Sequence, residues 1–531
     1  MRFDGLSRFA HQLSRKATPV LALLLIGLVY FLGVRSERTG FVREVLDPGL
    51  KRIAQPVLNA FRGAPPKLPL LHLVIDEALL DSMESDTEFG PAQTPFPIVI
   101  EVNGEQMSAS AIMMRAREAN DMDERPTWSI AIAQGDSLLN MGSFELRPVS
   151  DGAPLQEWIL QAALDRIGNP SLPFEFVDVR VNDRRSALHA MRGAIDPALL
   201  RSWKCGSGPV LRFDDALLRN VRGAVGPRNR SLAAVPQAQW LSAPLVILPL
   251  GSPQTASRAV RGERAVRSLE DFRADRSPTW SVFDLRATAR LFALSDLLGA
   301  QEACSWDRIR LIPDSVTGSI LPVPMFGKAL ERISTLHVQQ ATASLSPVMG
   351  PEFMDHLFHD RRFFATYMAY LDTFSAEGWT EHLIADLAPA IQLHERIVSG
   401  AFPGAHFDLG VVQENRRSIR QLLRPADLAL VFANAGPNKG RRPAAANVHA
   451  LPLRVLGMAC GGDTVLLRDE TILWPRTQGK PLEYVPLPLD IGTDAVTPCG
   501  LLLQVVGLPG VRSIPVRTWS TYAADDARPT K

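Results

Sequence analysis

Residues 96–116, FPIVIEVNGEQMSASAIMMRA, decide the fold of the amino-terminal half of this chain. Apolar and polar residues alternate on both sides of Asn103-Gly104, as they do in strands that bury one face. The Asn-Gly pair favours the positive backbone angles of a two-residue hairpin turn, so we predict two antiparallel strands joined there. Similar stretches predict further strands at 71–75, 127–133, 142–149 and 174–181.

Helical periodicity takes over towards the carboxyl terminus. Residues 155–167 place apolar side chains on one helix face, and longer helical patterns follow at 284–303, 351–374, 381–398 and 412–423. From 447 to 520, apolar segments alternate with Pro and Gly turns, which predicts a small β-sandwich-like module. The fold class expected is α+β, with a small β lobe, a larger helical and α/β lobe, and this terminal module.

The section 219–276 differs from its neighbours in composition. Pro and Gly are scattered among many arginines, in VRGAVGPRNRSLAAVP and SRAVRGERAVRSLEDFRADR. We interpret it as a basic insertion on the surface, with Glu263, Glu270 and Asp271 offsetting part of its charge. Such a loop could also contact anionic lipid headgroups or an acidic polymer, because guanidinium groups pair with phosphate and carboxylate.

The composition narrows the classes of function. The chain has 531 residues, with 57 Lys and Arg against 56 Asp and Glu, so its formal net charge is only +1. This balance lacks the basic footprint of a nucleic-acid binder. Four Cys without a CxxC pair exclude a disulfide-scaffolded miniprotein and give no sign of structural zinc. Cys460 and Cys499 could be bonded in an oxidising compartment, whereas Cys205 and Cys304 are expected to be buried free thiols.

Residues 17–34, ATPVLALLLIGLVYFLGV, form an uncharged run. In a helix this run rises about 27 Å, close to the hydrocarbon thickness of a bilayer. We predict one uncleaved transmembrane helix, because the run is long for a signal peptide and no A-x-A-like cleavage site follows. Basic residues flank it, with slightly more before it than after it. This bias favours a cytoplasmic tail at 1–16 and a large periplasmic or extracellular part at the inner (plasma) membrane of a bacterium.

The remaining boundaries follow from proline. Helical spacing at 41–61 is broken by Pro48 and Pro56, and the Pro-rich phrase APPKLP follows. We interpret 35–69 as a stalk and linker. A folded domain is expected at 70–446, and the terminal β module with its tail at 447–531.

Several phrases of the folded part stand in the same order as in a known family. They are LHLVID at 71–76, the Asn103-Gly104 hairpin, Thr127-Trp128-Ser129-Ile130, FVDVRVND at 176–183, and the long stretch from Asp284-Leu285-Arg286 to LFHDRRFFATYMAYL at 357–371. In this order they resemble the large, membrane-anchored bacterial members of the CotH kinase family, whose fold is an atypical kinase-like one. The resemblance runs from about residue 70 to 446, and for an active member it implies ATP and Mg²⁺.

The positions that would hold the nucleotide depart from the family pattern. By the resemblance, the nucleotide-binding lysine falls on Pro126, and Arg125 is the only neighbouring cation. The glutamate that would hold the lysine falls on Arg192 or Gly193. A positive or missing side chain there cannot pair with a lysine. Arg125 is therefore the candidate phosphate contact.

The positions that would bind the metal ion also depart from the family pattern. Met325 stands where the resemblance implies a metal-binding aspartate, so Asp307 remains the one candidate Mg²⁺ ligand. A single carboxylate is a poor Mg²⁺ site without help from substrate phosphates, and phosphoryl transfer depends on positioning and electrostatics. We therefore expect a catalytically degenerate domain.

The function expected is that of a membrane-anchored pseudokinase or binding scaffold in cell-envelope or surface-polymer assembly. Its partner would be a protein or an anionic or carbohydrate polymer, with no nucleic acid involved. The alternative is an active Mg-dependent ATP:protein phosphotransferase of the CotH type, with Arg125 on phosphate and Asp307 on the metal.

Two other patterns give weaker evidence about function. His356 and His359 lie at i and i+3, a spacing that suits a transition metal, but no third ligand can be located and a packing helix is the simpler interpretation. No G-x-S-x-G elbow or Ser-His-Asp set supports a hydrolase.

Overall fold

A computed structural model describes residues 66–85, 94–114, 126–133, 136–149, 153–206, 208–218, 239–248, 256–325, 327–343, 353–402, 406–425, 427–435, 441–475, 481–489 and 499–517. The chain divides into two compact units. One comprises 1–67 and 396–405, of which residues 66–67 and 396–402, the end of a helix, are described. The other comprises 68–395 and 406–531 and holds the features discussed below.

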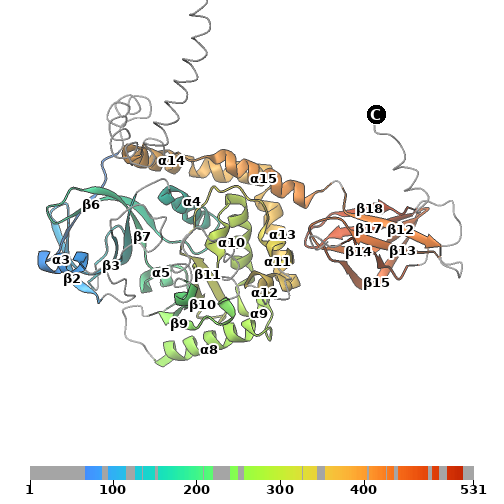
Figure 1. Cartoon of the computed structure of the whole chain (residues 1–531), viewed down its shortest axis with the longest axis horizontal. Helices are drawn as coiled ribbons and strands as arrows, with labels where there is room; N and C mark the ends of the chain where they lie inside the picture. The colour runs from blue at the N-terminus through green and yellow to red at the C-terminus, as the bar shows by residue number, and fades with distance from the viewer. Residues whose placement is uncertain are drawn as a thin grey trace, which may run out of the picture. The chain divides into compact units, whose positions relative to one another are not determined.

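Seven strands of the larger unit close into a barrel (Figure 1). They are β1 (Leu70–Val74), β2 (Phe96–Val102), β3 (Glu105–Met114), β4 (Thr127–Ile132), β5 (Ser143–Pro148), β6 (Phe174–Val181) and β7 (Ala187–Gly193). Their order is β1-β2-β3-β4-β5-β7-β6, and β1 closes the barrel by pairing in parallel with β6. The predicted hairpin is confirmed: Asn103 and Gly104 join β2 to β3 with φ angles of 52° and 87°.

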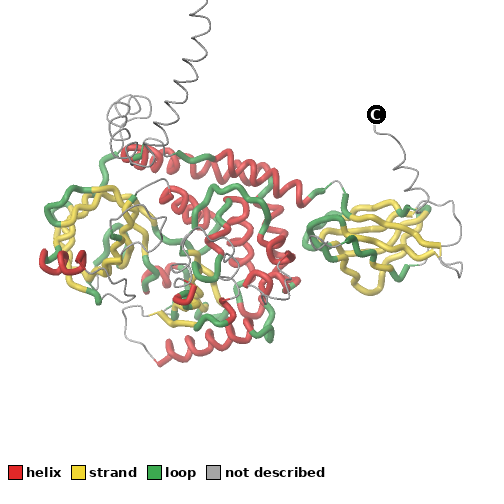
Figure 2. Tube along the Cα trace, viewed as in Figure 1, coloured by secondary structure: helices red, strands yellow, loops and turns green. Residues whose placement is uncertain are grey.

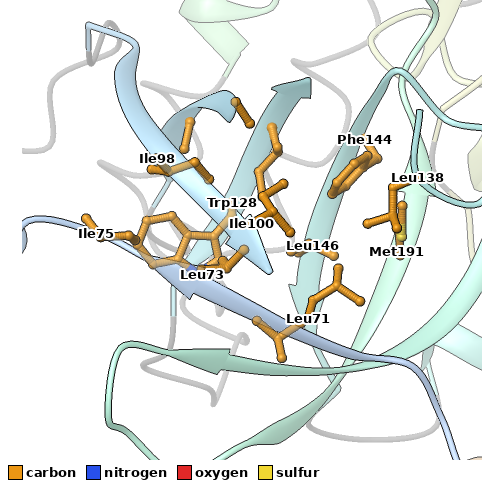
Figure 3. Packing of buried hydrophobic residues seen from close by; sticks show 14 of the residues in the cluster. Leu71, Leu73, Ile75, Ile98, Ile100, Trp128, Leu138, Phe144, Leu146 and Met191 are labelled. Atoms are coloured by element: carbon orange, nitrogen blue, oxygen red, sulfur yellow. The ribbon is translucent and has the colours of Figure 1, made fainter. Parts of the chain in front are cut away.

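Apolar side chains fill the barrel. Figure 3 shows Trp128 of β4 among Leu73, Ile98 and Ile100, with Phe144 nearby. Alternate residues of each strand point inward, and full burial of one such side chain contributes about 1.5–3 kcal/mol. The barrel is therefore a packed core that fixes the positions of β5 and β7. Helices α3 (Glu77–Ser85) and α4 (Ala153–Arg166) connect its strands.

A second sheet has the order β11-β10-β8-β9. Its strands are β8 (Val210–Phe213), β9 (Leu245–Leu248), β10 (Ile309–Pro313) and β11 (Ile320–Pro324), and α5 (Pro197–Ser202) precedes β8. Aromatic rings pack on one of its faces: Phe213 of β8 meets Trp240 at 6.0 Å and Phe353 at 6.5 Å between ring centroids. The other face carries Val210 and Ile312, which pack with Leu200 of α5.

Helices make up most of the remainder of this part (Figure 2). They are α8 (Ala256–Arg273), α9 (Thr279–Val282), α10 (Leu285–Leu298), α11 (His337–Ala343), α12 (Phe353–His359), α13 (Arg361–Phe374), α14 (Glu377–Ala401) and α15 (Leu409–Leu423). The buried helix α10 starts at Asp284, whose side chain accepts from Ala287 N at 2.8 Å. It ends at Gly299 with φ 63°, where a Cβ would lie 1.8 Å from the Glu331 carbonyl oxygen, so only glycine fits.

Helix α8 corrects the interpretation of 219–276 as an irregular basic insertion. Residues 256–273 form a regular helix, which runs along the second sheet in Figure 1. Gly262, Ala265, Leu269 and Phe272 are buried on it at helical spacing. The arginines masked this period, because most of them stand between the buried positions and one of them, Arg258, occupies a buried position itself. Residues 219–238 lie outside the described residues.

Two sheets form the carboxyl-terminal module, which Figure 2 shows as strands joined by loops. The strands are β12 (Ala429–Ala435), β13 (Arg441–Asn447), β14 (Leu453–Cys460), β15 (Asp463–Leu473), β16 (Val485–Pro486), β17 (Cys499–Val505) and β18 (Val511–Pro515). The module begins near residue 429 rather than at 447, because β12 and β13 pair with each other over seven residues. Cys460 and Cys499 face each other across β14 and β17 and form a disulfide.

The predicted fold class is wrong. The α+β, kinase-like description with a small β lobe and a larger helical and α/β lobe does not fit the described residues. The structure is mixed α/β with several sheets, and its first sheet is a closed seven-stranded barrel. Among the described residues, no helix is long and apolar enough to cross a membrane. The segment 17–34, on which the transmembrane helix was predicted, lies outside the described residues.

Candidate functional site

Arg192, at the end of β7, lies at the centre of a buried ion cluster. Its Nη1 donates to Glu157 Oε1 at 2.5 Å and its Nη2 donates to Glu145. Glu157 comes from α4 and also accepts from Arg147 of β5. The cluster thus ties the helix to two adjacent barrel strands. Arg192 and Glu157 are each only 5% exposed at the side chain.

The same arginine also reaches the second sheet. Its Nη1 donates to the Met325 carbonyl oxygen at 2.6 Å, directly after β11. Burial alone would lower the pKa of Arg192, but Glu145 and Glu157 outweigh burial and raise its pKa. The guanidinium is therefore charged, and both of its terminal nitrogens are hydrogen-bonded. By the sequence resemblance, Arg192 and Met325 mark two positions of a phosphotransfer site, and here they are joined in a structural contact.

Of the two site residues predicted from the sequence, the structure describes Asp307. Asp307 lies between a short 3-10 helix and β10, half-buried, and accepts a hydrogen bond from the Ser305 hydroxyl. Arg125 lies outside the described residues, so its role as a phosphate contact stays a prediction. In the described part of the chain, no group of three or more His, Cys, Asp or Glu side chains could hold a metal ion. His356 is buried beside Trp240, at 5.1 Å between ring centroids, as expected for a packing helix.

A pocket of about 720 Å³ opens between α4 and α5. Trp158 and Asp165 line it from one face of α4, residues 168–174 form another side, and Trp203 and Lys204 line it after α5. The period of α4 explains this: residues 158, 161, 162 and 165 repeat on one face. The pocket therefore combines aromatic rings with one acidic and one basic side chain.

Two amides fix the shape of this pocket. Gln161 accepts from Leu172 N at 2.8 Å and donates to the Pro324 carbonyl at 3.2 Å, which holds the segment after α4 in place. Asn169 donates through Nδ2 to the Ala287 carbonyl at 2.9 Å. Asn169 is only 6% exposed, yet no group in the described part of the chain donates to its Oδ1. An unused buried acceptor at a pocket wall is a place for a ligand donor.

Sequence reasoning missed both sites. It placed no pocket at residues 155–167, which it interpreted as a helix with one apolar face, and it assigned Glu145 and Glu157 no role. A signal was present, since Glu157 stands next to Trp158 within the apolar face of a predicted helix. A charged residue at a core position needs a buried partner. The partner, Arg192, lies 35 residues away, and spacing alone does not reveal it.

A third polar cluster lies in the helical core. Asp296 of α10 accepts from the Tyr367 hydroxyl at 2.5 Å and from Gln301 Nε2 at 2.5 Å. His337 Nδ1 lies 3.0 Å from Asp296 Oδ1, as an ion pair rather than an aligned hydrogen bond. Burial would lower the pKa of His337, but Asp296 and then Cys304 raise it to about 10. Asp296 and His337 are fully buried, so this cluster joins α10, α11 and α13 and does not meet a substrate.

The chain matches no protein-family model, and no curated protein matches it. The resemblance to the CotH kinase family therefore stays a prediction.

Proposed function

We propose that this chain is a non-catalytic binding scaffold and that its partner is a carbohydrate polymer held in the α4–α5 pocket. The composition of that pocket carries the proposal. A sugar ring offers an apolar C–H face to an aromatic side chain and hydroxyls to polar groups. Trp203 supplies an aromatic ring, Asp165 a carboxylate, and Lys204 an ammonium group.

The Arg192 cluster supports the non-catalytic part. An active phosphotransferase holds a cation for the phosphates and carboxylates for Mg²⁺. Here Arg192 is occupied by Glu145, Glu157 and the Met325 carbonyl oxygen. A buried guanidinium whose two terminal nitrogens are both bonded inside the protein cannot turn them towards a nucleotide.

The disulfide supports the location of the chain in an oxidising compartment. Cys460 and Cys499 are bonded, and disulfides persist in oxidising compartments such as the cell envelope or the extracellular space. A scaffold for an envelope or surface polymer would work in such a compartment. ATP is not ordinarily supplied there, which agrees with a non-catalytic role.

Calorimetric titration of the full chain tests the ligand class. The probes are hexasaccharides of glucose, N-acetylglucosamine and galacturonic acid. We expect one of them to bind, and Trp203→Ala and Asp165→Asn to weaken that binding at least tenfold, or about 1.4 kcal/mol. Trp474→Ala is the matched control, because Trp474 is 63% exposed and lies outside the pocket. Absence of binding by all three, or equal loss in the Trp474 variant, would overturn the carbohydrate assignment.

The alternative function has a separate readout. If the chain is an active phosphotransferase, ATP raises its melting temperature only with Mg²⁺ or Mn²⁺, since binding to the native state stabilises it. Asp307→Ala would remove that shift. A metal-dependent rise in melting temperature that Asp307→Ala removes would overturn the non-catalytic assignment. This conclusion would hold whether or not the hexasaccharides bind.

A further inference from the structure

Two arginines face each other on the second sheet. Leu211 of β8 pairs with Leu311 of β10 in antiparallel register, which places Arg212 directly beside Arg310. Side chains alternate along a strand, so both arginines share the face that carries Val210 and Ile312. Leu211 and Leu311 point to the opposite face. Like charges directly opposite on adjacent strands destabilise a sheet.

The fold supplies these arginines with little compensation. The Nη1 of Arg310 donates to its neighbour's carbonyl, Ile309 O, at 3.2 Å, and no carboxylate of the described residues lies within 4.0 Å of it. Among the described carboxylates, Arg212 has those of Asp215 at 3.7 Å and Asp214 at 3.9 Å. These distances exceed those of N–H···O hydrogen bonds.

The electrostatics agree with this geometry. Burial first, and then the charge of Arg212, lower the pKa of Arg310 to about 10, while Asp215 and Glu145 act in the opposite direction. Arg310 therefore remains charged at neutral pH. Glu145 does not form a close ion pair with Arg310, because its carboxylate binds Arg192.

An oxyanion would compensate both guanidiniums at once. Each guanidinium carries five N–H donors in a planar fork, which suits the oxygens of phosphate. A phosphate dianion also has the charge to offset two cations that repel each other. Carboxylate shares the charge sign but presents its two oxygens in one plane.

We propose that Arg212 and Arg310 form a binding site for the phosphate group of a ligand, independent of Mg²⁺. The site lies on different elements from the α4–α5 pocket, so it goes beyond the proposed carbohydrate binding and does not depend on it. Phosphate can reach it as a terminal monoester or as a diester within a polymer. Both present the same oxygens to the two guanidiniums.

Calorimetry on the full chain in EDTA at low salt tests the site. The probes are pyrophosphate, glycerol 3-phosphate as a monoester, glycerophosphocholine as a diester, and citrate as a carboxylate. We expect at least one phosphate probe to bind, with at least a tenfold weaker Kd in Arg310→Gln and in Arg212→Gln. Stronger binding of the monoester would assign a terminal phosphate, and stronger binding of the diester would assign a polymer backbone.

Arg276→Gln is the control, because Arg276 is 62% exposed and is already paired with Asp271 at 2.7 Å. It should leave the phosphate Kd unchanged. The melting temperature of each variant shows that it is folded. Absence of phosphate binding, tighter binding of citrate than of phosphate, or an equal loss in the Arg276 variant would each overturn the site.

Discussion

Arg192 lies on the barrel sheet, whereas Arg212 and Arg310 lie on the second sheet. The guanidinium groups at these two places differ in their partners. Arg192 has two carboxylates and a carbonyl oxygen within hydrogen-bond reach, and it is almost completely buried. Arg212 and Arg310 are partly exposed and lie beside each other, and among the described residues no carboxylate comes closer to either than the 3.7 Å between Arg212 and Asp215. A buried charge that is fully paired serves the fold, whereas a charge that the fold leaves uncompensated is a candidate for a ligand.

Replacing Arg192 should have the largest effect. Arg192→Met would leave Glu157 buried without a partner at Oε1, so we expect a loss of about 3–5 kcal/mol in the free energy of unfolding, measured by urea denaturation. The double variant Arg192→Met/Glu157→Gln should recover part of this, because it removes a buried charge as well. A loss below about 1 kcal/mol would mean that Arg192 is not the centre of a structural cluster.

The His337–Asp296 pair should produce the next largest effect, through pH. The pKa of His337 is raised to about 10 in the folded chain, above its usual value, so the folded state holds this proton more tightly than the unfolded state. The resulting stability is complete below about pH 6.5 and is lost as pH rises towards 10. We expect a loss on the order of 3 kcal/mol between pH 6 and pH 10 in urea denaturation.

His337→Gln separates this loss from other titrations. The variant should be less stable at pH 6 but should change less between pH 6 and pH 10 than the unmodified chain. The comparison stops at pH 10, because the pKa of Tyr367 is raised well above its usual value by burial and Asp296, which adds a further loss above that pH. Equal changes in both proteins would contradict the ion pair.

Parts of the fold were predictable because their signals are local. The Asn103-Gly104 turn and the alternation around it predicted β2 and β3, and the strand expected at 174–181 is β6. Barrel closure was not predictable, because it depends on β1 pairing with β6 across about a hundred residues. Helix α8 was missed because arginines outnumber its buried apolar residues.

The candidate sites were harder to predict than the fold. Arg192 drew attention in the sequence only because a positive side chain stands there in place of the glutamate that the resemblance implies. Its carboxylate partners come from β5 and α4, and no sequence spacing reveals such a contact. Arg212 and Arg310 become neighbours only through the register of β8 and β10. The pocket arises where α4, the segment after it and α5 meet.

Replacing Arg310 should change stability with the opposite sign to Arg192. Arg310→Leu removes a partly buried charge that repels Arg212 and leaves no carboxylate unpaired. We expect no loss, or a gain of up to about 1 kcal/mol, in urea denaturation in the absence of phosphate. Phosphate should stabilise the unmodified chain and not the variant. A loss as large as that of Arg192→Met would mean that Arg310 has a structural partner.

An exposed ion pair sets the lower end of the comparison. Arg166 Nη2 lies 2.5 Å from Asp386 Oδ2, as close as the Arg192 contact with Glu157, but the two side chains are 58% and 43% exposed. Water already solvates both charges, so Arg166→Gln should cost less than about 1 kcal/mol in urea denaturation, and less at high salt. Because the two contacts have the same distance, the difference between them reflects burial together with the further partners of Arg192, and not contact distance. A cost for Arg166→Gln that matches Arg192→Met would show that contact distance, and not desolvation, determines the strength of these pairs.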